Sequence, residues 1–412
     1  MAGQPAVCVL ATLDSKPAAI QFVCDSLRQA GVVPWLVDLS LRPHAHGFAD
    51  VSGAEVAKAA GLSWDALARL SRTDATHAMI RGGIGIVQAK QRAGGIAGAF
   101  GFGGANGSTM ACAIMRALPL SFPKVMVTPV AATAAVQWYV AESDIAMFPT
   151  VGDIWLNRIT RAAIENAARA VAGMVRQRSR APADSRALIG VSSFGNLQPA
   201  VDRVTAQLES KGFEVIHFHA SGPGGRALEE LARRGELAGV IDLTTSELTD
   251  SLTGGVYSAG EARLTGAGQA GIPQVVVPGC LDFTNWWVGE VPERYRRREF
   301  FQYNLEILLM RTNAEEFAAL GRLMGERLAT ATGPVSVLIP SKGWSALVGR
   351  NAHDLSGTVT GPWARPDVDN VFVEALRRNF AGAIKELPHH INDAGFAEAC
   401  VVELTALMPE KN

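Results

Sequence analysis

Short apolar runs alternate with longer amphipathic segments along the first part of the chain. Residues 7–11 (VCVLA) read as a buried parallel strand, and residues 32–39 (VVPWLVDL) as a second. Three more strands are predicted at 96–102, 124–129 and 145–148. Helices are predicted at 17–31, 64–91, 107–118 and 153–175, the second of them interrupted by Gly82, Gly83 and Gly85.

The same alternation restarts after a polar segment, 177–186 (QRSRAPADSR), which is the best linker candidate. Beyond it, strands are predicted at 187–191, 214–218, 238–243, 274–277, 307–310 and 335–339. Helices are predicted at 197–211, 225–234, 314–328 and 368–379. This pattern indicates an α/β protein with two Rossmann-like, doubly wound parallel-sheet domains, residues 1–178 and 186–412.

Composition supports a globular chain with two cores and sets limits on its partners. Of 412 residues, 48% are hydrophobic and 19% charged, and the formal net charge is -1, so no pull toward nucleic acid or an anionic membrane is expected. The charge-free stretches 93–115 and 125–141 are broken by glycines and by Pro129, so neither is expected to span a membrane. No signal peptide is evident and the five cysteines have no paired spacing, so we expect a cytoplasmic protein with reduced thiols.

A glycine-rich segment, residues 101–109 (GFGGANGST), lies between a predicted strand and a predicted helix. Glycines there let backbone amides at a helix start approach phosphate oxygens. The segment is neither a Walker A loop nor a complete G-x-G-x-x-G, and no acid follows some twenty residues on, so a mononucleotide is favoured over a nicotinamide cofactor. The alternative is a tight turn without ligand. The candidate nucleotide-binding residues here are Gly103, Gly104, Asn106, Gly107, Ser108 and Thr109.

The turn after the first predicted strand is expected at the same edge of the sheet. There Thr12 is a candidate hydrogen-bond donor and Lys16 a candidate phosphate partner. Asp14 and Asp153, which opens the predicted helix 153–175, are the candidate Mg²⁺ ligands. Capping of helices is the alternative role for both aspartates.

Several predicted strands of the second domain end in polar residues. These ends are expected to meet at one sheet edge, as in a site for a small polar metabolite. The candidate catalytic residues are His219, Arg226, Glu247, Asp282 and Lys342. The pairs His44–His46 and His217–His219 have no third ligand nearby, so a transition-metal centre is not favoured.

Long segments spread in order over nearly the whole chain carry a family resemblance. They include ATLDSK, GFGGANGST, PKVMVTPVA, DIWLNRIT, HASGPGGRALEEL, GVIDLTTSEL, VPERY and HHIND. With these segments the chain resembles the Tm-1-like ATP-binding proteins, an uncharacterised family with N- and C-terminal domains. The resemblance implies an N-terminal Rossmann-like ATP-binding domain, a second α/β domain and a homodimer. It places the phosphate cradle on Gly103, Gly104, Gly107, Ser108 and Thr109.

Two function classes follow. The first is an ATP- and Mg²⁺-dependent enzyme of phosphoryl-transfer or ligase type that acts on a small organic metabolite in the cleft between the domains. The second is a nucleotide-binding regulatory or interaction protein without turnover. A nicotinamide oxidoreductase is a third hypothesis, which only a preference for NAD(H) over ATP would favour.

Overall fold

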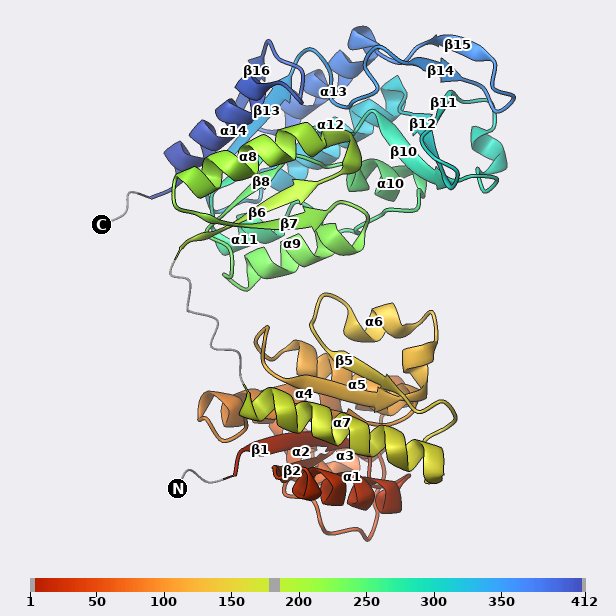
Figure 1. Ribbon diagram of the computed structural model, residues 1–412, viewed down its shortest axis with the longest axis vertical. Helices are drawn as coiled ribbons and strands as arrows, with labels where there is room; N and C mark the ends of the chain where they lie inside the picture. The colour runs from red at the N-terminus through yellow and green to blue at the C-terminus, as the bar shows by residue number, and fades with distance from the viewer. Residues whose placement is uncertain (1–3, 178–185, 410–412) are drawn as a thin grey trace. The chain divides into compact units, whose positions relative to one another are not determined.

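A computed structural model of the chain describes residues 4–177 and 186–409. The chain divides into two units, residues 1–183 and 184–412 (Figure 1). The linker predicted at 177–186 falls almost wholly on residues 178–185, which lie outside the described residues. Each unit has its own sheet and its own core, and each is therefore described by itself.

Unit 1 is built on a five-stranded parallel sheet. Its strands stand in the order β2-β1-β3-β4-β5, so the direction of winding reverses between β1 and β3. This is the flavodoxin-like doubly wound order. The strands are β1 (Ala6–Ala11), β2 (Val33–Asp38), β3 (Gly98–Phe102), β4 (Lys124–Thr128) and β5 (Ala146–Pro149).

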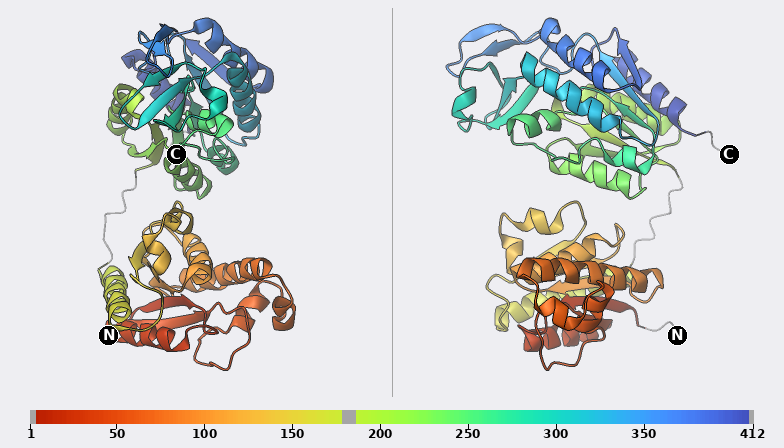
Figure 2. Two further views of the ribbon diagram at one scale, coloured as in Figure 1. Left: turned by 90° about the vertical axis from the view of Figure 1, so that its right-hand side faces the viewer. Right: turned by 180° about the vertical axis from the view of Figure 1, so that it is seen from behind.

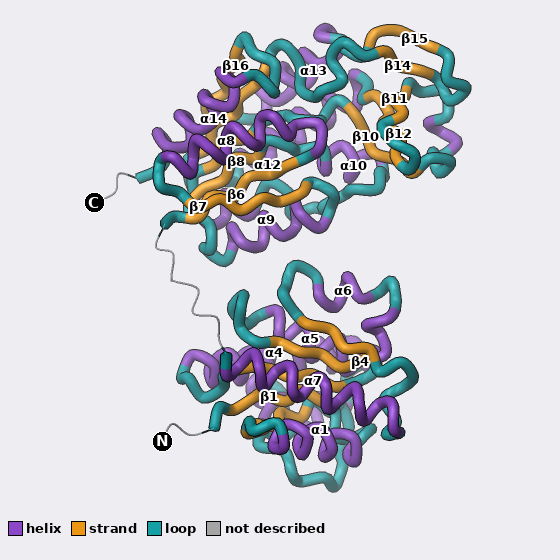
Figure 3. The backbone as a smooth tube through the Cα atoms, in the orientation of Figure 1, coloured by secondary structure: helices purple, strands orange, loops and turns teal. Residues whose placement is uncertain are grey.

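Helices cover both faces of this sheet (Figure 3). On one face α1 (Pro17–Gln29) and α7 (Arg158–Arg176) pack their apolar sides against β1, β3 and β4. On the other face the packing helices are α2 (Gly53–Ala59), α4 (Arg72–Arg92) and α5 (Ala105–Arg116). Shorter elements are α3 (Trp64–Ala68), η1 (Pro129–Ala132) and α6 (Val136–Val140).

Two helix predictions in unit 1 were wrong in detail. Helix α4 runs without a break through its glycines, and two of them allow close helix packing: a Cβ would lie 2.0 Å from the Val56 carbonyl oxygen on Gly82 and 2.4 Å from Ile114 Cδ1 on Gly83. Helix α7 begins at Arg158, not at Asp153. Asn157 caps it, since its side chain accepts the N–H groups of Ile159 and Thr160.

Unit 2 contains a six-stranded parallel sheet in the order β16-β13-β9-β8-β6-β7, with its reversal between β6 and β8. The predicted fold class, two doubly wound parallel-sheet domains, is thus confirmed. The strands are β6 (Leu188–Ser193), β7 (Glu214–His219), β8 (Gly239–Asp242), β9 (Gln274–Val276), β13 (Val335–Pro340) and β16 (Ala383–Leu387).

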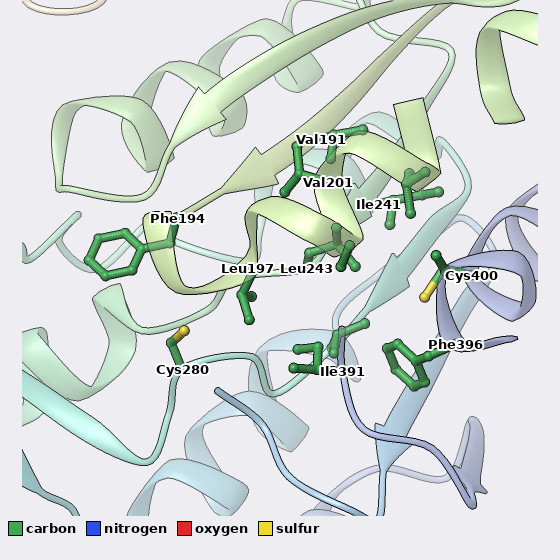
Figure 4. Packing of buried hydrophobic residues seen from close by; sticks show 14 of the residues in the cluster. Val191, Phe194, Leu197, Val201, Ile241, Leu243, Cys280, Ile391, Phe396 and Cys400 are labelled. Atoms are coloured by element: carbon green, nitrogen blue, oxygen red, sulfur yellow. The ribbon is translucent and has the colours of Figure 1, made fainter. Parts of the chain in front are cut away.

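Two helix layers again enclose the sheet of unit 2. Helices α8 (Gln198–Ser210) and α14 (Ala394–Leu407) bury a core that includes Val201, Ile241 and Phe396 (Figure 4). On the opposite face, α12 (Ala314–Leu328) and α13 (Pro366–Asn379) pack with α10 (Glu247–Thr253). Further elements are η2 (Gly195–Leu197), α9 (Pro223–Arg233) and α11 (Gly266–Ala270).

A second, antiparallel sheet completes unit 2 and can be followed in Figure 2. Its order is β10-β12-β11-β14-β15, so the strand predicted at 307–310 does not join the parallel sheet. Only residues 303–306 connect β11 to β12, too few for the crossover that parallel pairing needs. The elements are β10 (Phe283–Trp287), η3 (Glu293–Tyr295), β11 (Phe300–Gln302), β12 (Ile307–Arg311), β14 (Asn351–His353) and β15 (Val359–Pro362).

A membrane-spanning helix was not expected from the sequence. Among residues 4–177 and 186–409, none of the helices combines the length and the apolar character needed to cross a bilayer.

Candidate functional site

A pocket of about 720 Å³ lies in unit 1 beside the carboxyl ends of β1 and β3. The winding of the sheet reverses between these two strands, and open α/β sheets bind their ligands outside such a reversal. The volume is within the range of small-molecule sites. Six residues predicted from the sequence line the pocket together: Thr12, Asp14, Lys16, Gly104, Asn106 and Gly107.

The start of helix α5 forms one wall of this pocket. No side chain caps the helix, so the amides of its first turn keep their donor capacity. The glycines leave room in front of these amides: a Cβ added to Gly104 or Gly107 would meet no protein atom closer than 3.9 Å. Uncapped amides at the positive end of a helix favour an anion such as phosphate.

Three other predicted cradle residues do not line the pocket. Gly103 lets the loop close on the helix, because a Cβ there would lie 3.0 Å from the Gly107 Cα. Ser108 is fully buried, and its hydroxyl hydrogen-bonds with the Gly104 carbonyl oxygen at 2.9 Å and with the Thr128 hydroxyl at 2.7 Å. The Thr109 hydroxyl donates to the Ala105 carbonyl at 3.1 Å. Both hydroxyls are therefore engaged within the protein, and the residues that this glycine-rich segment contributes to the pocket lining are Gly104, Ala105, Asn106 and Gly107.

Lys16 brings positive charge to the lining of the pocket. Its ammonium group lies 3.4 Å from the centre of the Trp155 ring, and Trp155 is itself exposed. Within the described ranges no carboxylate forms an ion pair with Lys16. An aromatic face only partly balances a cation, so Lys16 is available to an anionic ligand.

Asp14 is held in place by residues that the sequence analysis missed. Its N–H donates to Ser40 Oγ at 3.0 Å, and the N–H of Leu13 donates to Asp38 Oδ1 at 3.1 Å. Asp38 ends β2, is buried, and lies 2.8 Å from His44 Nε2. Partial burial and the nearby charge of Asp38 raise the pKa of Asp14. The signal that could have identified Asp38 is its position as an acid near the end of the strand predicted at 32–39.

The two predicted magnesium ligands differ in placement. Asp14 lines the pocket, whereas Asp153 is exposed outside it and accepts the N–H of its neighbour Ile154 at 2.7 Å. In the described parts of the chain, no three His, Cys, Asp or Glu side chains come together as a metal site. Nucleotide-bound Mg²⁺ usually takes one or two protein carboxylates besides phosphate oxygens and water, a requirement that Asp14 fits.

The second glycine-rich loop, after β7, is filled by the protein itself. Glu247 Oε1 accepts the N–H groups of Gly222 at 2.7 Å and Gly225 at 3.1 Å, at the start of α9. Its other oxygen accepts Arg263 Nε at 2.6 Å. Burial raises the pKa of Glu247, while Arg263 and the amides act in the opposite direction. A buried side-chain carboxylate thus occupies the start of α9, a position that favours an anion.

Arg263 joins three carboxylates in the interior of unit 2. It contacts Glu229 and Glu247, and two of its nitrogens bind Asp242. All four side chains are buried, so Glu247 serves here as part of an internal ion network. The sequence analysis missed Arg263, since a single arginine in a loop carries no spacing signal.

A pocket of about 350 Å³ lies in unit 2 beside the end of β13. Of the five predicted catalytic residues, Asp282 and Lys342 line it. The others lie elsewhere: Glu247 is in the ion network, the His219 ring stacks on Phe194 at 5.4 Å, and Arg226 is in the first turn of α9. The structure thus brings together two of the five predicted residues.

Comparison with known proteins places both units in one family. The chain matches the profiles described as "Uncharacterised protein family (UPF0261) N-terminal domain" over residues 5–180 and the corresponding C-terminal domain over residues 186–408. A UPF0261 protein of Mesorhizobium japonicum is 39% identical over 95% of this chain and 96% of its own length. The ToMV resistance protein Tm-1(GCR237) of Solanum lycopersicum is 33% identical over 76% of this chain and 42% of its own length.

A solved structure of UDP-N-acetylglucosamine 2-epimerase from Rickettsia bellii is also similar. It shares 10% identity over 66% of this chain and 78% of its own, with a TM-score of 0.21. That score is too low to carry an argument about function.

Proposed function

The chain belongs to the UPF0261 family, and we propose that its N-terminal unit binds a nucleotide, ATP by preference, in the pocket beside β1 and β3. One observation carries this proposal. The uncapped start of α5 presents its amides, over Gly104 and Gly107, to a pocket at the reversal of the sheet.

The chemistry of the pocket suits a nucleotide in three respects. Amides at the start of α5 would hydrogen-bond phosphate oxygens, and the Lys16 ammonium would neutralise part of their charge. Asp14, which lines the pocket, would hold Mg²⁺, and the ion would supply further charge neutralisation at the phosphates. Apolar side chains that line the same pocket, those of Leu41, Leu67 and Leu70, suit a base.

The leading form of the proposal is an ATP- and Mg²⁺-dependent enzyme of phosphoryl-transfer or ligase type. Phosphoryl transfer needs positioning and charge neutralisation above all, which the α5 amides and Lys16 supply. The polar strand ends of unit 2 would hold a small organic metabolite. The homodimer stays a prediction.

A second candidate is nucleotide binding without turnover, in a regulatory or interaction protein. The dispersal of His219, Arg226 and Glu247 favours it, since the structure does not assemble the five predicted catalytic residues into one site.

Native mass spectrometry and calorimetry on the full chain test the proposal. We expect Mg²⁺·ATP to bind saturably and more tightly than NAD⁺ or NADH, and we expect nucleotide to accompany the purified protein. Turnover of ATP in the presence of one of a panel of hydroxy and keto acids would identify an enzyme. Binding without turnover across the panel would favour the second candidate, and absence of ATP binding would remove both.

A further inference from the structure

The 350 Å³ pocket of unit 2 has an unusual set of charged groups. Three carboxylates and two cations line it: Asp282, Asp369, Glu386, Arg311 and Lys342. Two of the carboxylates already have partners. Asp369 Oδ1 lies 2.6 Å from Arg311 Nη2, and Glu386 pairs with Arg377, which lies outside the pocket wall.

Asp282 is only half satisfied. Its Oδ2 accepts hydrogen bonds from Ser345 Oγ at 2.6 Å and Trp363 Nε1 at 2.7 Å. Its Oδ1 is buried and, in the part of the chain that the structure describes, has no hydrogen-bond partner. The residue as a whole is 4% exposed. A buried carboxylate oxygen without a partner is costly, so a donor from a bound molecule would stabilise it.

Lys342 supplies the complementary charge. Its backbone is fixed, because its N–H donates to the His389 carbonyl at 3.0 Å, while its side chain is exposed. None of the carboxylates in the described ranges pairs with its ammonium group. Within the described residues, Asp282 and Lys342 thus bring one acceptor without a partner and one cation without an ion pair to a pocket that Trp344 and Trp363 also line.

We propose that this pocket binds a small carboxylate whose neighbouring carbon carries a hydrogen-bond donor, as in a hydroxy acid or an amino acid. The donor group binds Asp282 Oδ1, and the carboxylate binds the Lys342 ammonium. A volume of about 350 Å³ lies at the lower end of the range of small-molecule sites and has room for a ligand of this kind. The inference rests on the metabolite half of the proposed function and deepens it, and it does not require the nucleotide pocket of unit 1.

Isothermal titration calorimetry on the full chain without nucleotide tests this chemistry with four probes. Glycerate and serine carry both groups, glycerol lacks the carboxylate, and propionate lacks the donor. We expect saturable binding of glycerate or serine, and at least about tenfold weaker binding of glycerol and propionate, since each lacks one charge-assisted contact. Binding of glycerate but not of serine identifies a hydroxyl donor, and binding of serine but not of glycerate identifies an ammonium donor. Binding of neither, or equal binding of propionate, overturns the proposal.

Two variants assign the contacts. Asp282→Asn keeps an oxygen for Ser345 and Trp363 but turns the unpartnered position into a donor, and Lys342→Met removes an exposed charge with little effect on folding. Each should weaken the bound probe at least about tenfold. Lys211→Met, at an exposed site outside the pocket, is the control and should change nothing. If Asp282→Asn fails to fold, Lys342→Met decides, and unchanged affinity in it contradicts the proposal.

A parallel ATP titration separates this inference from the nucleotide proposal. Both variants should bind ATP as the wild type does, because neither residue lines the pocket of unit 1. If the wild type binds glycerate or serine but not ATP, this inference stands and the nucleotide proposal is removed. If it binds ATP but neither glycerate nor serine, the nucleotide proposal stands and this inference is removed.

Discussion

Two glycine-rich loops, one after β3 and one after β7, look alike in the sequence and differ in the structure. Each follows a parallel strand and precedes a helix. At the first, the start of α5 is uncapped and opens on a pocket. At the second, Glu247 already accepts the N–H groups of Gly222 and Gly225.

The space around the glycines of the two loops differs accordingly. A Cβ on Gly225 would lie 2.0 Å from Glu247 Oε2, whereas a Cβ on Gly107 would find its nearest neighbour 3.9 Å away. The second loop needs glycine to admit a carboxylate of the protein, and the first has no such internal partner. A strand, a glycine loop and a helix therefore predict an anion position, and only the tertiary structure tells whether the anion is a ligand.

The largest effect is expected from removing the internal carboxylate. Glu247→Ala leaves Arg263 and two glycine amides without their partner, so the free energy of unfolding of unit 2 should fall by about 3–5 kcal/mol. Urea unfolding followed by circular dichroism measures it. Glu236→Ala, at an exposed position just after α9, is the control and should stay within about 0.5 kcal/mol. A loss of that small size in Glu247→Ala would mean that the second loop is not held by its carboxylate.

A second test uses pH. Helix α10, which carries Glu247, also carries the buried acid Asp250. Burial raises the pKa of Asp250 to about 7, above the usual 3.8. The folded state thus holds a proton that the unfolded state releases, and Asp250 lowers stability as pH rises from about 4 to about 7, by up to about 1.4 kcal/mol per pH unit. Asp250→Asn should therefore be more stable than the wild type above pH 7 and lose that advantage near pH 4.

Unfolding curves at several pH values measure this difference. The substitution is geometrically mild, since Asn285 donates to Asp250 at 2.9 Å and has an amide oxygen without a partner that can accept from an asparagine after rotation. Asp202→Asn, on the exposed side of α8, should leave the pH dependence unchanged. Parallel curves for Asp250→Asn and wild type would refute the assignment.

The third test concerns Gly225, which lies in close contact with Glu247. Gly225→Ala forces a methyl group onto the Glu247 carboxylate and should lower the free energy of unfolding by about 1–3 kcal/mol. The control is Gly173→Ala, in open space within α7, which should be neutral or slightly stabilising. Gly235→Ala is unsuitable as a control, because the φ of +73° at Gly235 disfavours any side chain. Equal stability of Gly225→Ala and wild type would contradict the close contact.

The smallest effect is expected at the open loop. Lys16→Met removes one charge from the pocket wall and should weaken Mg²⁺·ATP about tenfold, the size of one charge-assisted contact, with little change in stability. Lys58→Met, exposed in α2 and outside the pocket, serves as its matched control in the same calorimetric titration. An unchanged affinity in Lys16→Met would remove this residue from the site.

Local patterns were sufficient for much of the fold. The apolar runs at 7–11 and 124–129 correspond to buried strands, and helical spacing located α5 and α12. The antiparallel placement of β12 was not predictable from its apolar run, since pairing depends on connections and not on composition. The start of α7 was missed because the Asn157 cap competes with an equally plausible acid upstream.

The candidate site was also partly predictable from local patterns. Residues that follow strands, such as Lys16 and Lys342, were found because parallel strands end at one edge. Two other contacts depend on side chains distant in sequence, which no local pattern reveals. The Ser108 hydroxyl bonds with Thr128, 20 residues away, and Glu247 binds Arg263, 16 residues away.

Calorimetric titration of Mg²⁺·ATP into the wild type and into a Gly104→Ala, Gly107→Ala variant tests the open loop most directly. Both added methyl groups enter pocket space and meet no protein atom closer than 3.9 Å, so the free energy of unfolding should stay within about 1 kcal/mol. The account predicts that the variant binds ATP at least about tenfold more weakly than the wild type. A folded variant with undiminished ATP affinity, or a wild type that binds no ATP, would contradict it.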